Sequence, residues 1–295
     1  MKQIRYAAEA IVLYIFFAFF RILPVASASN VGGFIGRTIG PKLAASRKAY
    51  RNLNAALPQL ESEEQKEIIT EMWDNLGRVI AEYPHLESIS TQRAVLENSA
   101  ILQDLIMQEQ PAVFFGAHQG NWEVNGALLC TQFNQPVDIT YRAPNNPWSG
   151  KLLMKARTLG GQLGVIAKSR SAGKMLIQSI KNKRHIGVLL DQKYREGLAV
   201  PFFGMPAMTN PVFIQLCQKY DCPLIPVRNI RLGPARFEIR LYEPIELFTK
   251  DGQARSAEDV LIEINALLED WIIQNPGQWL WLHRRWDSLE NSNSN

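Results

Sequence analysis

Residues 111–126 read PAVFFGAHQGNWEVNG and are the most informative stretch of the chain. Their first half is a short, continuous apolar run, which is typical of a strand buried on both faces of a parallel sheet. A turn of small residues follows around Gly120, and a helix is predicted to begin near Asn121 or Trp122. A strand, a turn and a helix in this order indicate an α/β fold.

The same alternation of apolar runs and helix-period segments continues towards the C-terminus. We therefore expect a mostly parallel central sheet that is flanked by helices. The expected strands are 111–117, 137–143, 162–167, 185–190, 223–229 and 236–241, and the expected helices are 122–132, 147–159, 171–182, 210–220 and 256–274. Before this α/β core of residues 106–290, residues 27–105 are expected to be mainly helical, and the polar residues 291–295 are expected to form a disordered tail.

Residues 1–26 are expected to form a membrane-anchoring helix. Residues 10–20 read AIVLYIFFAFF, an uninterrupted apolar run with basic residues on both sides. The run is too short to span a bilayer alone, so a marginal spanning helix and a helix lying in the interface both stay open. A cleaved signal peptide is the alternative, because the basic start and Ala26-Ser27-Ala28 resemble its parts. We favour a retained anchor, because three cysteines without C-x-x-C spacing suit a reducing compartment better.

The overall charge argues against nucleic-acid binding. The 295 residues carry a net charge of +4, and the basic residues are scattered rather than gathered in one run. The densest basic stretch contains Lys42, Arg47, Lys48 and Arg51 and follows the apolar N-terminal segment. These side chains could face the phosphates of a lipid surface or form a solvated helix face, and the sequence leaves both interpretations open.

His118 and Glu123 are the candidate catalytic pair. His118 lies at the carboxyl end of the predicted strand, where open α/β sheets place their ligands. Residues five apart on one helix point in different directions, but a turn at Gly120 allows the two side chains to converge. The imidazole would take a proton from an attacking hydroxyl, and the carboxylate would fix its tautomer. The oxyanion would need donors, either backbone N–H groups at the helix start or a nearby arginine.

The pair alone is a weak signal, since a loop histidine and a helix-start carboxylate at this spacing are common. Other catalytic classes lack their motifs, because the chain contains no G-x-S-x-G elbow, no H-E-x-x-H and no clustered set of metal ligands. The glycines at positions 32, 33 and 36 do not follow an early strand, so a dinucleotide site is not indicated. Acid–base chemistry without a metal is the interpretation that remains.

Several blocks in order along the chain carry a family resemblance. They are Gly77-Arg78 with Glu82, HQGNWE at 118–123, Tyr141-Arg142 with Asn146-Pro147, Arg157, Asp191-Gln192, PFFG at 201–204 with Thr209, Pro226 with Arg228, and QWLWLHRRW at 278–286. Over most of its length the chain resembles the late acyltransferases of lipid A biosynthesis, the lauroyl and myristoyl transferases of the H-x4-D/E lysophospholipid acyltransferase superfamily. The resemblance implies a lysophospholipid-acyltransferase-like fold.

The resemblance also implies a site and its substrates. The implied catalytic residues are His118, Glu123 and Arg157, and the implied substrate-binding residues are Gln119, Gly120, Asn121, Tyr141, Arg142, Asp191 and Gln192. The implied reaction moves a fatty-acyl chain from acyl carrier protein, or from coenzyme A, to a hydroxyl of a lipid A precursor, with no metal or other cofactor. The implied location is the inner membrane, with the catalytic domain on its cytoplasmic face and in contact with the membrane surface.

Two alternatives stay open: an acyltransferase for a lysophospholipid or another amphipathic alcohol, and a non-catalytic lipid-binding protein on the same fold. The chain departs from the family pattern at residues 193–197, which affects the identity of the acceptor most. The aromatic and basic residues of 278–286 fit an interfacial segment and core packing equally well, and we do not expect His283 to be catalytic.

Overall fold

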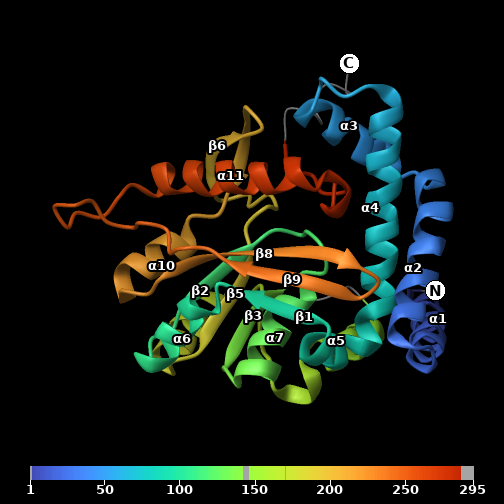
Figure 1. Ribbon diagram of the computed structural model, residues 1–295, viewed down its shortest axis with the longest axis horizontal. Coiled ribbons are helices and arrows are strands. Elements are labelled where there is room, and N and C mark those ends of the chain that lie inside the picture. Colours follow the sequence, from blue (N-terminus) through green and yellow to red (C-terminus); the bar gives the residue numbers. More distant parts are fainter. Residues whose placement is uncertain (1, 142–145, 170, 287–295) are drawn as a thin grey trace.

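The computed structural model describes residues 2–141, 146–169 and 171–286 (Figure 1). The helices are α1 (Lys2–Ile22), α2 (Val25–Ile39), α3 (Ser46–Ala56), α4 (Ser62–Glu82), α5 (Leu86–Gln92), α6 (Ser99–Met107), α7 (Glu123–Phe133), α8 (Pro147–Arg157), α9 (Ala172–Lys181), α10 (Val212–Tyr220) and α11 (Ala257–Gln274), with short 3-10 turns that include η2 (Tyr83–His85) and η4 (Pro276–Gln278). The strands are β1 (Ala94–Glu97), β2 (Val113–Gly116), β3 (Val137–Tyr141), β4 (Gly164–Ala167), β5 (His185–Leu189), β6 (Leu198–Phe202), β7 (Met205–Thr209), β8 (Leu224–Gly233) and β9 (Arg236–Leu241).

Within the described residues, seven strands form the central sheet in the order β1-β9-β8-β2-β5-β3-β4. Every neighbouring pair is parallel except β8 and β9, which pair antiparallel. The predicted α/β class with a mostly parallel sheet is therefore confirmed. Each of the six strands predicted after residue 110 is present, and β9 has the predicted bounds.

Two strand features differ from the predictions. β1 lies inside the region 27–105 that was expected to be mainly helical, and it joins the edge of the sheet beside β9. Its four residues alternate between buried and exposed, so β1 lacks the continuous apolar run by which the other strands were recognised. β6 and β7 form a separate antiparallel hairpin, whose turn at Phe203 and Gly204 has positive φ angles of 51° and 71°.

The core lies on both faces of the sheet. Successive side chains of a strand point to opposite faces, so Val113 and Phe115 pack into one buried cluster and Phe114 into another. The first cluster includes α11 and the second includes α6 and α7, which lie on opposite sides of the sheet in Figure 1. Helices therefore cover the faces of the sheet, and the carboxyl ends of its central strands remain to build a site.

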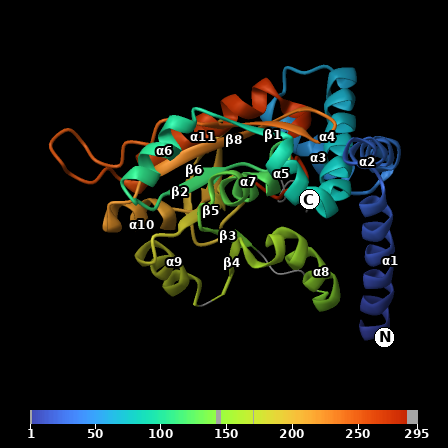
Figure 2. The same cartoon turned by 60° about the horizontal axis from the view of Figure 1, so that its bottom comes forward.

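Figure 2 shows α1 extending away from the body of the molecule, with α8 beside it. Asn146, at the start of α8, donates its amide to the backbone oxygen of Tyr6 on α1 at 2.8 Å. A set of large apolar side chains on α1 is exposed, namely Ile11, Val12, Ile15, Phe19 and Ile22. Among the helices that the structure describes, none has both the length and the apolar character that crossing a membrane requires. The membrane anchor expected in residues 1–26 is thus not confirmed.

Helices α2 and α4 approach each other closely through glycines. A Cβ atom at Gly36 would lie 2.1 Å from the backbone oxygen of Trp73, and one at Gly77 would lie 2.2 Å from the backbone oxygen of Gly32. Backbone atoms cannot move aside as the end of a flexible side chain can. The close contact between the two helices therefore requires glycine at these positions.

We expect Gly36→Ala to lower the free energy of unfolding by about 1–3 kcal/mol, because the added methyl group overpacks the α2–α4 contact. Gly173→Ala is the matched control: Gly173 is also helical, and a Cβ there meets nothing within 4 Å. The control should be stabilised by up to about 1 kcal/mol, since alanine favours helix. Urea unfolding measures both, and equal stability of the two variants would contradict the close approach.

Candidate active site

His118 meets Asp191 because their strands are neighbours. β2 and β5 pair in parallel with Gly116 opposite Leu189, and each of the two side chains lies two residues beyond that pair. The Nδ1 atom of His118 lies 2.8 Å from Oδ1 of Asp191. The backbone N–H of His118 and the indole N–H of Trp279 both donate to Oδ2, each at 2.8 Å. Both oxygens of this fully buried carboxylate are thus occupied by internal donors.

The contacts of Asp191 define its charge and the tautomer of His118. Burial alone would raise the pKa of Asp191, but the neighbouring His118 and the hydrogen bonds that it donates outweigh this and hold the pKa well below its ordinary value. An ionised carboxylate accepts the Nδ1 proton, so in the neutral imidazole Nε2 carries the lone pair. The His118 side chain is 15% exposed. A base is therefore available at the carboxyl end of β2.

Glu123 lies in a separate cluster, at the start of α7. Arg157, at the end of α8, donates Nε to its carboxylate at 2.6 Å, and the hydroxyl of Tyr83 donates at 2.6 Å. Burial lowers the pKa of Arg157, but the Glu123 carboxylate outweighs this and raises it above its ordinary value. The pKa of Tyr83 is raised by burial and by Glu123. Arg157 and Glu123, both expected from the sequence, are therefore brought together, and Tyr83 is an addition that the sequence did not indicate.

The carboxylate that fixes the imidazole tautomer is Asp191, whereas we expected Glu123 in that position. Among the described residues, no hydrogen bond or ion pair joins His118 to Glu123, although Trp122 contacts both. The Trp122 ring lies 5.0 Å from the His118 ring, and its Nε1 donates to Glu123 at 3.1 Å. The physical reason is that Arg157 and Tyr83 hold Glu123 while the register of β2 and β5 delivers Asp191. A catalytic role for Glu123 stays a prediction.

The loop after His118 is held from inside the protein. Gly120 has a φ of 59°, and a Cβ there would lie 2.3 Å from Oδ1 of Asn229, so the turn requires glycine. Gln119 donates its amide to the backbone oxygen of Trp271 at 2.9 Å, and Asn121 donates its own to Glu82 at 2.8 Å. The side chains of Gln119 and Asn121 are buried. These contacts position the loop, and the substrate-binding role expected of Gln119, Gly120 and Asn121 stays a prediction.

A buried ion pair helps to hold the same loop in place. Arg231 on β8 contacts both oxygens of the fully buried Glu82, at 2.5 and 3.0 Å. Arg231 also donates Nε to Asn75, whose amide donates to the backbone oxygen of Gly120 at 2.9 Å. Glu82 belongs to the sequence blocks that carry the family resemblance, and its contacts indicate a positioning role.

Gln192 bridges two histidines. Its Nε2 atom lies 2.8 Å from Nε2 of His118 and 2.8 Å from Nε2 of His283. The two imidazole rings are 4.8 Å apart. Burial, the nearby His118 and Lys48 lower the pKa of His283 to about 3, against a smaller opposing effect of Asp191. His283 is therefore neutral, and it lies at the site although we did not expect a catalytic part for it.

The other residues expected at the site are placed less completely. Tyr141 ends β3, and its ring lies 5.9 Å from the guanidinium carbon of Arg157, which places it beside the Glu123 cluster. Arg142 lies outside the described residues. Among the residues that are described, no group of three or more His, Cys, Asp or Glu side chains is arranged to hold a metal ion.

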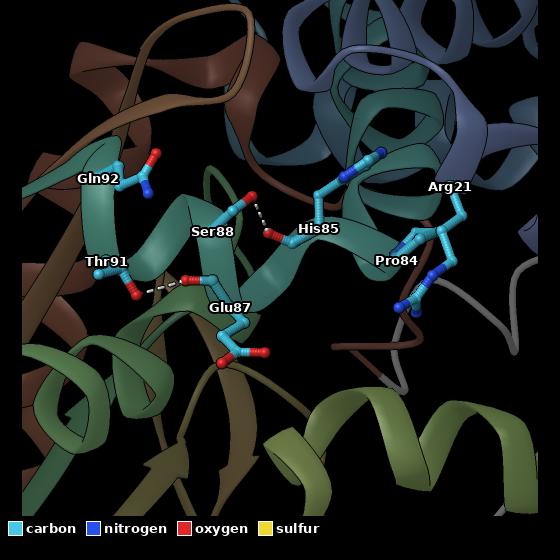
Figure 3. A pocket seen from close by; sticks show the side chains of 7 residues that line it. All are labelled: Arg21, Pro84, His85, Glu87, Ser88, Thr91 and Gln92. Carbon is cyan, nitrogen blue, oxygen red and sulfur yellow. Dashed lines mark hydrogen bonds between the residues drawn. The ribbon is translucent and has the colours of Figure 1, made fainter.

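A surface pocket of about 470 Å³ lies between the end of α1, η2 and α5 (Figure 3). It is lined by Arg21, Pro84, His85, Glu87, Ser88, Thr91 and Gln92. Two of its hydroxyls, those of Ser88 and Thr91, donate to backbone oxygens of the same segment at 3.1 and 2.7 Å. His118 is not part of this lining, and charged and polar groups do not suit a fatty-acyl chain. The pocket is therefore distinct from the chemistry of His118.

Comparison with known proteins shows which family the sequence matches. The sequence matches the family described as bacterial lipid A biosynthesis acyltransferase over residues 1–288. It is similar to a lipid A biosynthesis palmitoleoyltransferase of Escherichia coli (strain K12) and to a lipid A biosynthesis acyltransferase of Shigella flexneri. Each is 25% identical over 249 residues, which cover 80% of this chain and 77% of the relative. Because the family match spans nearly the whole chain, the chain belongs to the bacterial lipid A biosynthesis acyltransferase family.

Proposed function

We propose that the protein transfers a fatty-acyl chain from an acyl thioester to a hydroxyl of a lipid A precursor, with His118 as general base. As a member of its family it is an acyltransferase, and the family implies a lipid A precursor as acceptor. The observation that supports the mechanism is the hydrogen bond between His118 and Asp191, which leaves Nε2 as a base on a partly exposed side chain.

The proposed reaction needs no nucleophile from the protein. The acceptor hydroxyl gives its proton to Nε2 of His118 while its oxygen bonds to the thioester carbonyl carbon. The carbonyl electron pair moves to oxygen, and the buried anion of Asp191 stabilises the imidazolium that forms. The tetrahedral intermediate then expels the thiolate, which takes the proton back from His118. The products are an ester and a free thiol, and the enzyme is unchanged.

Glu123 and Arg157 are proposed to shape the site around this base. The Glu123 carboxylate accepts from Arg157, Tyr83 and the indole of Trp122, and the Trp122 ring packs against the imidazole. Arg157 retains 19% exposure of its side chain. A guanidinium at this position suits a phosphorylated or otherwise anionic acceptor. We therefore propose that Glu123 supports catalysis by positioning its neighbours, and that Arg157 supports it by binding the acceptor.

Donor and chain length are proposals on the same basis. We propose acyl carrier protein as the donor, with coenzyme A as the variant, because both present a thioester to an enzyme of this type. We propose a lauroyl or myristoyl chain as the transferred group. One relative is named for a different chain, palmitoleoyl, so the relatives do not decide the chain length. No metal or other cofactor takes part in the proposed steps.

We propose that the protein works at the cytoplasmic face of the inner membrane. The exposed apolar side chains of α1, such as Ile11, Ile15 and Phe19, suit a helix that lies in a lipid interface. Lys42 and Arg47 follow α2 in the chain and could face anionic headgroups. Because α8 is tied to α1 through Asn146, such a surface would lie near the helix that carries Arg157.

The function is tested by the mass of the lipid product. Purified protein is incubated with acyl carrier protein bearing one fatty-acyl chain, and with a tetra-acylated lipid A precursor. We expect a product heavier by one acyl group, and none when the precursor is left out. Parallel reactions use acyl coenzyme A as donor and a lysophospholipid as acceptor. Acylation of the lysophospholipid alone would replace the proposed acceptor, and no product from any combination would favour a non-catalytic lipid-binding protein.

A further inference from the structure

The amide of Gln192 occupies the atom that the reaction needs. Nδ1 of His118 donates to Asp191, so Nε2 is an acceptor and the amide nitrogen of Gln192 donates to it at 2.8 Å. The same nitrogen lies 2.8 Å from Nε2 of His283, which is neutral and accepts as well. An amide NH₂ group has two hydrogens, and both are used here. In the free enzyme, the lone pair of the base is therefore occupied by a hydrogen bond from Gln192, which we call the cap.

Most of the N–H groups that could form an oxyanion hole already donate hydrogen bonds within the protein. The backbone N–H groups of His118, Asn121 and Glu123 donate to internal oxygens at 2.8, 3.0 and 3.2 Å. The backbone N–H of Gly120 donates to the oxygen of Gln278 at 3.1 Å. Arg157 is engaged by Glu123 and Tyr83. The amide of Gln192 is, by contrast, a donor directly at the base.

We propose that the amide of Gln192 donates a hydrogen bond to the oxyanion that forms during acyl transfer. In the free enzyme the same amide caps His118. Once the acceptor hydroxyl has displaced this cap, His283 holds the amide within reach of the oxyanion. The inference rests on the proposed function, since it concerns the same acyl-transfer site. When the acceptor hydroxyl takes the lone pair of His118, one hydrogen of the Gln192 amide is released while the other stays on His283. The released N–H then lies beside the attacking oxygen. This oxygen bonds to the carbonyl carbon, and the oxygen already on that carbon becomes the oxyanion. Gln192 is a catalytic residue in this scheme, and His283 is a positioning residue that acts through it.

The kinetic test compares three variants. Gln192→Leu should lower kcat about 10²-fold, as the loss of one oxyanion donor does elsewhere. His283→Phe keeps a ring beside His118 but removes the acceptor, and should lower kcat about tenfold. The double variant should be no slower than Gln192→Leu, because His283 acts only through Gln192. Gln218→Leu is the matched control, because that glutamine also donates two hydrogen bonds, at 3.1 and 2.8 Å, but to backbone oxygens away from the site. Its kcat should stay within roughly threefold of the wild type.

The cap is tested without any substrate. Diethyl pyrocarbonate acylates neutral imidazole, and mass spectrometry of the His118 peptide gives its rate. At high pH, Gln192→Leu should modify His118 about fivefold faster than the wild type, since one hydrogen bond to the lone pair is lost. The titratable side chains beside the imidazole, Asp191 and His283, are unchanged in this variant.

These readouts separate the possible failures. A wild-type enzyme that acylates no acceptor overturns the proposed function, whereas the modification rates still report on the cap. Unchanged rates in Gln192→Leu overturn the cap. In an enzyme that is otherwise active, the role of Gln192 is overturned if Gln192→Leu has the same kcat as Gln218→Leu. The role of His283 is overturned if the losses of the two single variants add fully in the double variant.

Discussion

His118→Ala is expected to lower the rate of acyl transfer at least about 10³-fold. General-base catalysis contributes about 10²–10⁴-fold, and the variant also loses the imidazolium that Asp191 would stabilise. The thioester donor and the acceptor should still bind, so the loss should fall on kcat rather than on KM. The measurement is the initial rate of formation of the heavier lipid product, at saturating acceptor.

His85→Ala is the control for this variant. The Nε2 of His85 contacts the backbone oxygen of Phe20 at 2.8 Å, so its removal costs a hydrogen bond between η2 and α1 without touching the imidazole of His118. Its kcat should stay within a few-fold of the wild type. Full activity of His118→Ala, with unfolding curves that match the wild type, would show that His118 is not the base.

Asp191→Asn is expected to lower kcat by about 10³–10⁴-fold although it removes no atom of the base. The backbone N–H of His118 and the indole N–H of Trp279 both point at Oδ2 of Asp191. An asparagine would turn its single carbonyl oxygen towards these two donors and its NH₂ group towards Nδ1. Nδ1 must then accept, the ring proton moves to Nε2, and the lone pair that attacks the hydroxyl proton is lost.

The tautomer is measured directly by ¹⁵N chemical shifts of His118 in the two proteins. We expect the proton on Nδ1 in the wild type and on Nε2 in Asp191→Asn. Glu123→Gln is the informative comparison, because it removes the other carboxylate and leaves the contact between His118 and Asp191 in place. If Glu123→Gln inverted the tautomer and Asp191→Asn did not, the sequence-based interpretation of the pair would be right and the arrangement described here would be wrong.

Much of the architecture could be predicted because it depends on local pattern. The apolar runs at β2, β5 and the start of β8 form central strands of the sheet, as predicted, although β8 continues to Gly233, beyond the predicted end at residue 229. β1 and the β6–β7 hairpin were missed because they lack a continuous apolar run: β1 alternates between buried and exposed residues, and β6 and β7 each contain a proline. The predicted anchor in residues 1–26 rests on composition, and no helix in the described part of the chain has the character of a membrane span.

The structure pairs the predicted site residues differently from the sequence-based interpretation. The sequence placed His118 and Asp191 independently at carboxyl ends of strands, and the pattern of single strands says nothing about which strands are neighbours. Glu123 was paired with His118 because the two are close in the chain. Gln192 and His283 are separated by 91 positions and come together only when the C-terminal segment folds back over the sheet.

Local sequence therefore determines most of the elements of this protein and the edge of the sheet at which its proposed chemistry lies, because apolar periodicity and turn residues act over a few positions. The order of the strands, and with it the choice of Asp191 rather than Glu123 as the partner of the imidazole, depends on packing between residues far apart in the chain. Contacts of that kind carry no local pattern, so only the folded structure reveals that β2 and β5 are adjacent and in a register that brings the two side chains together.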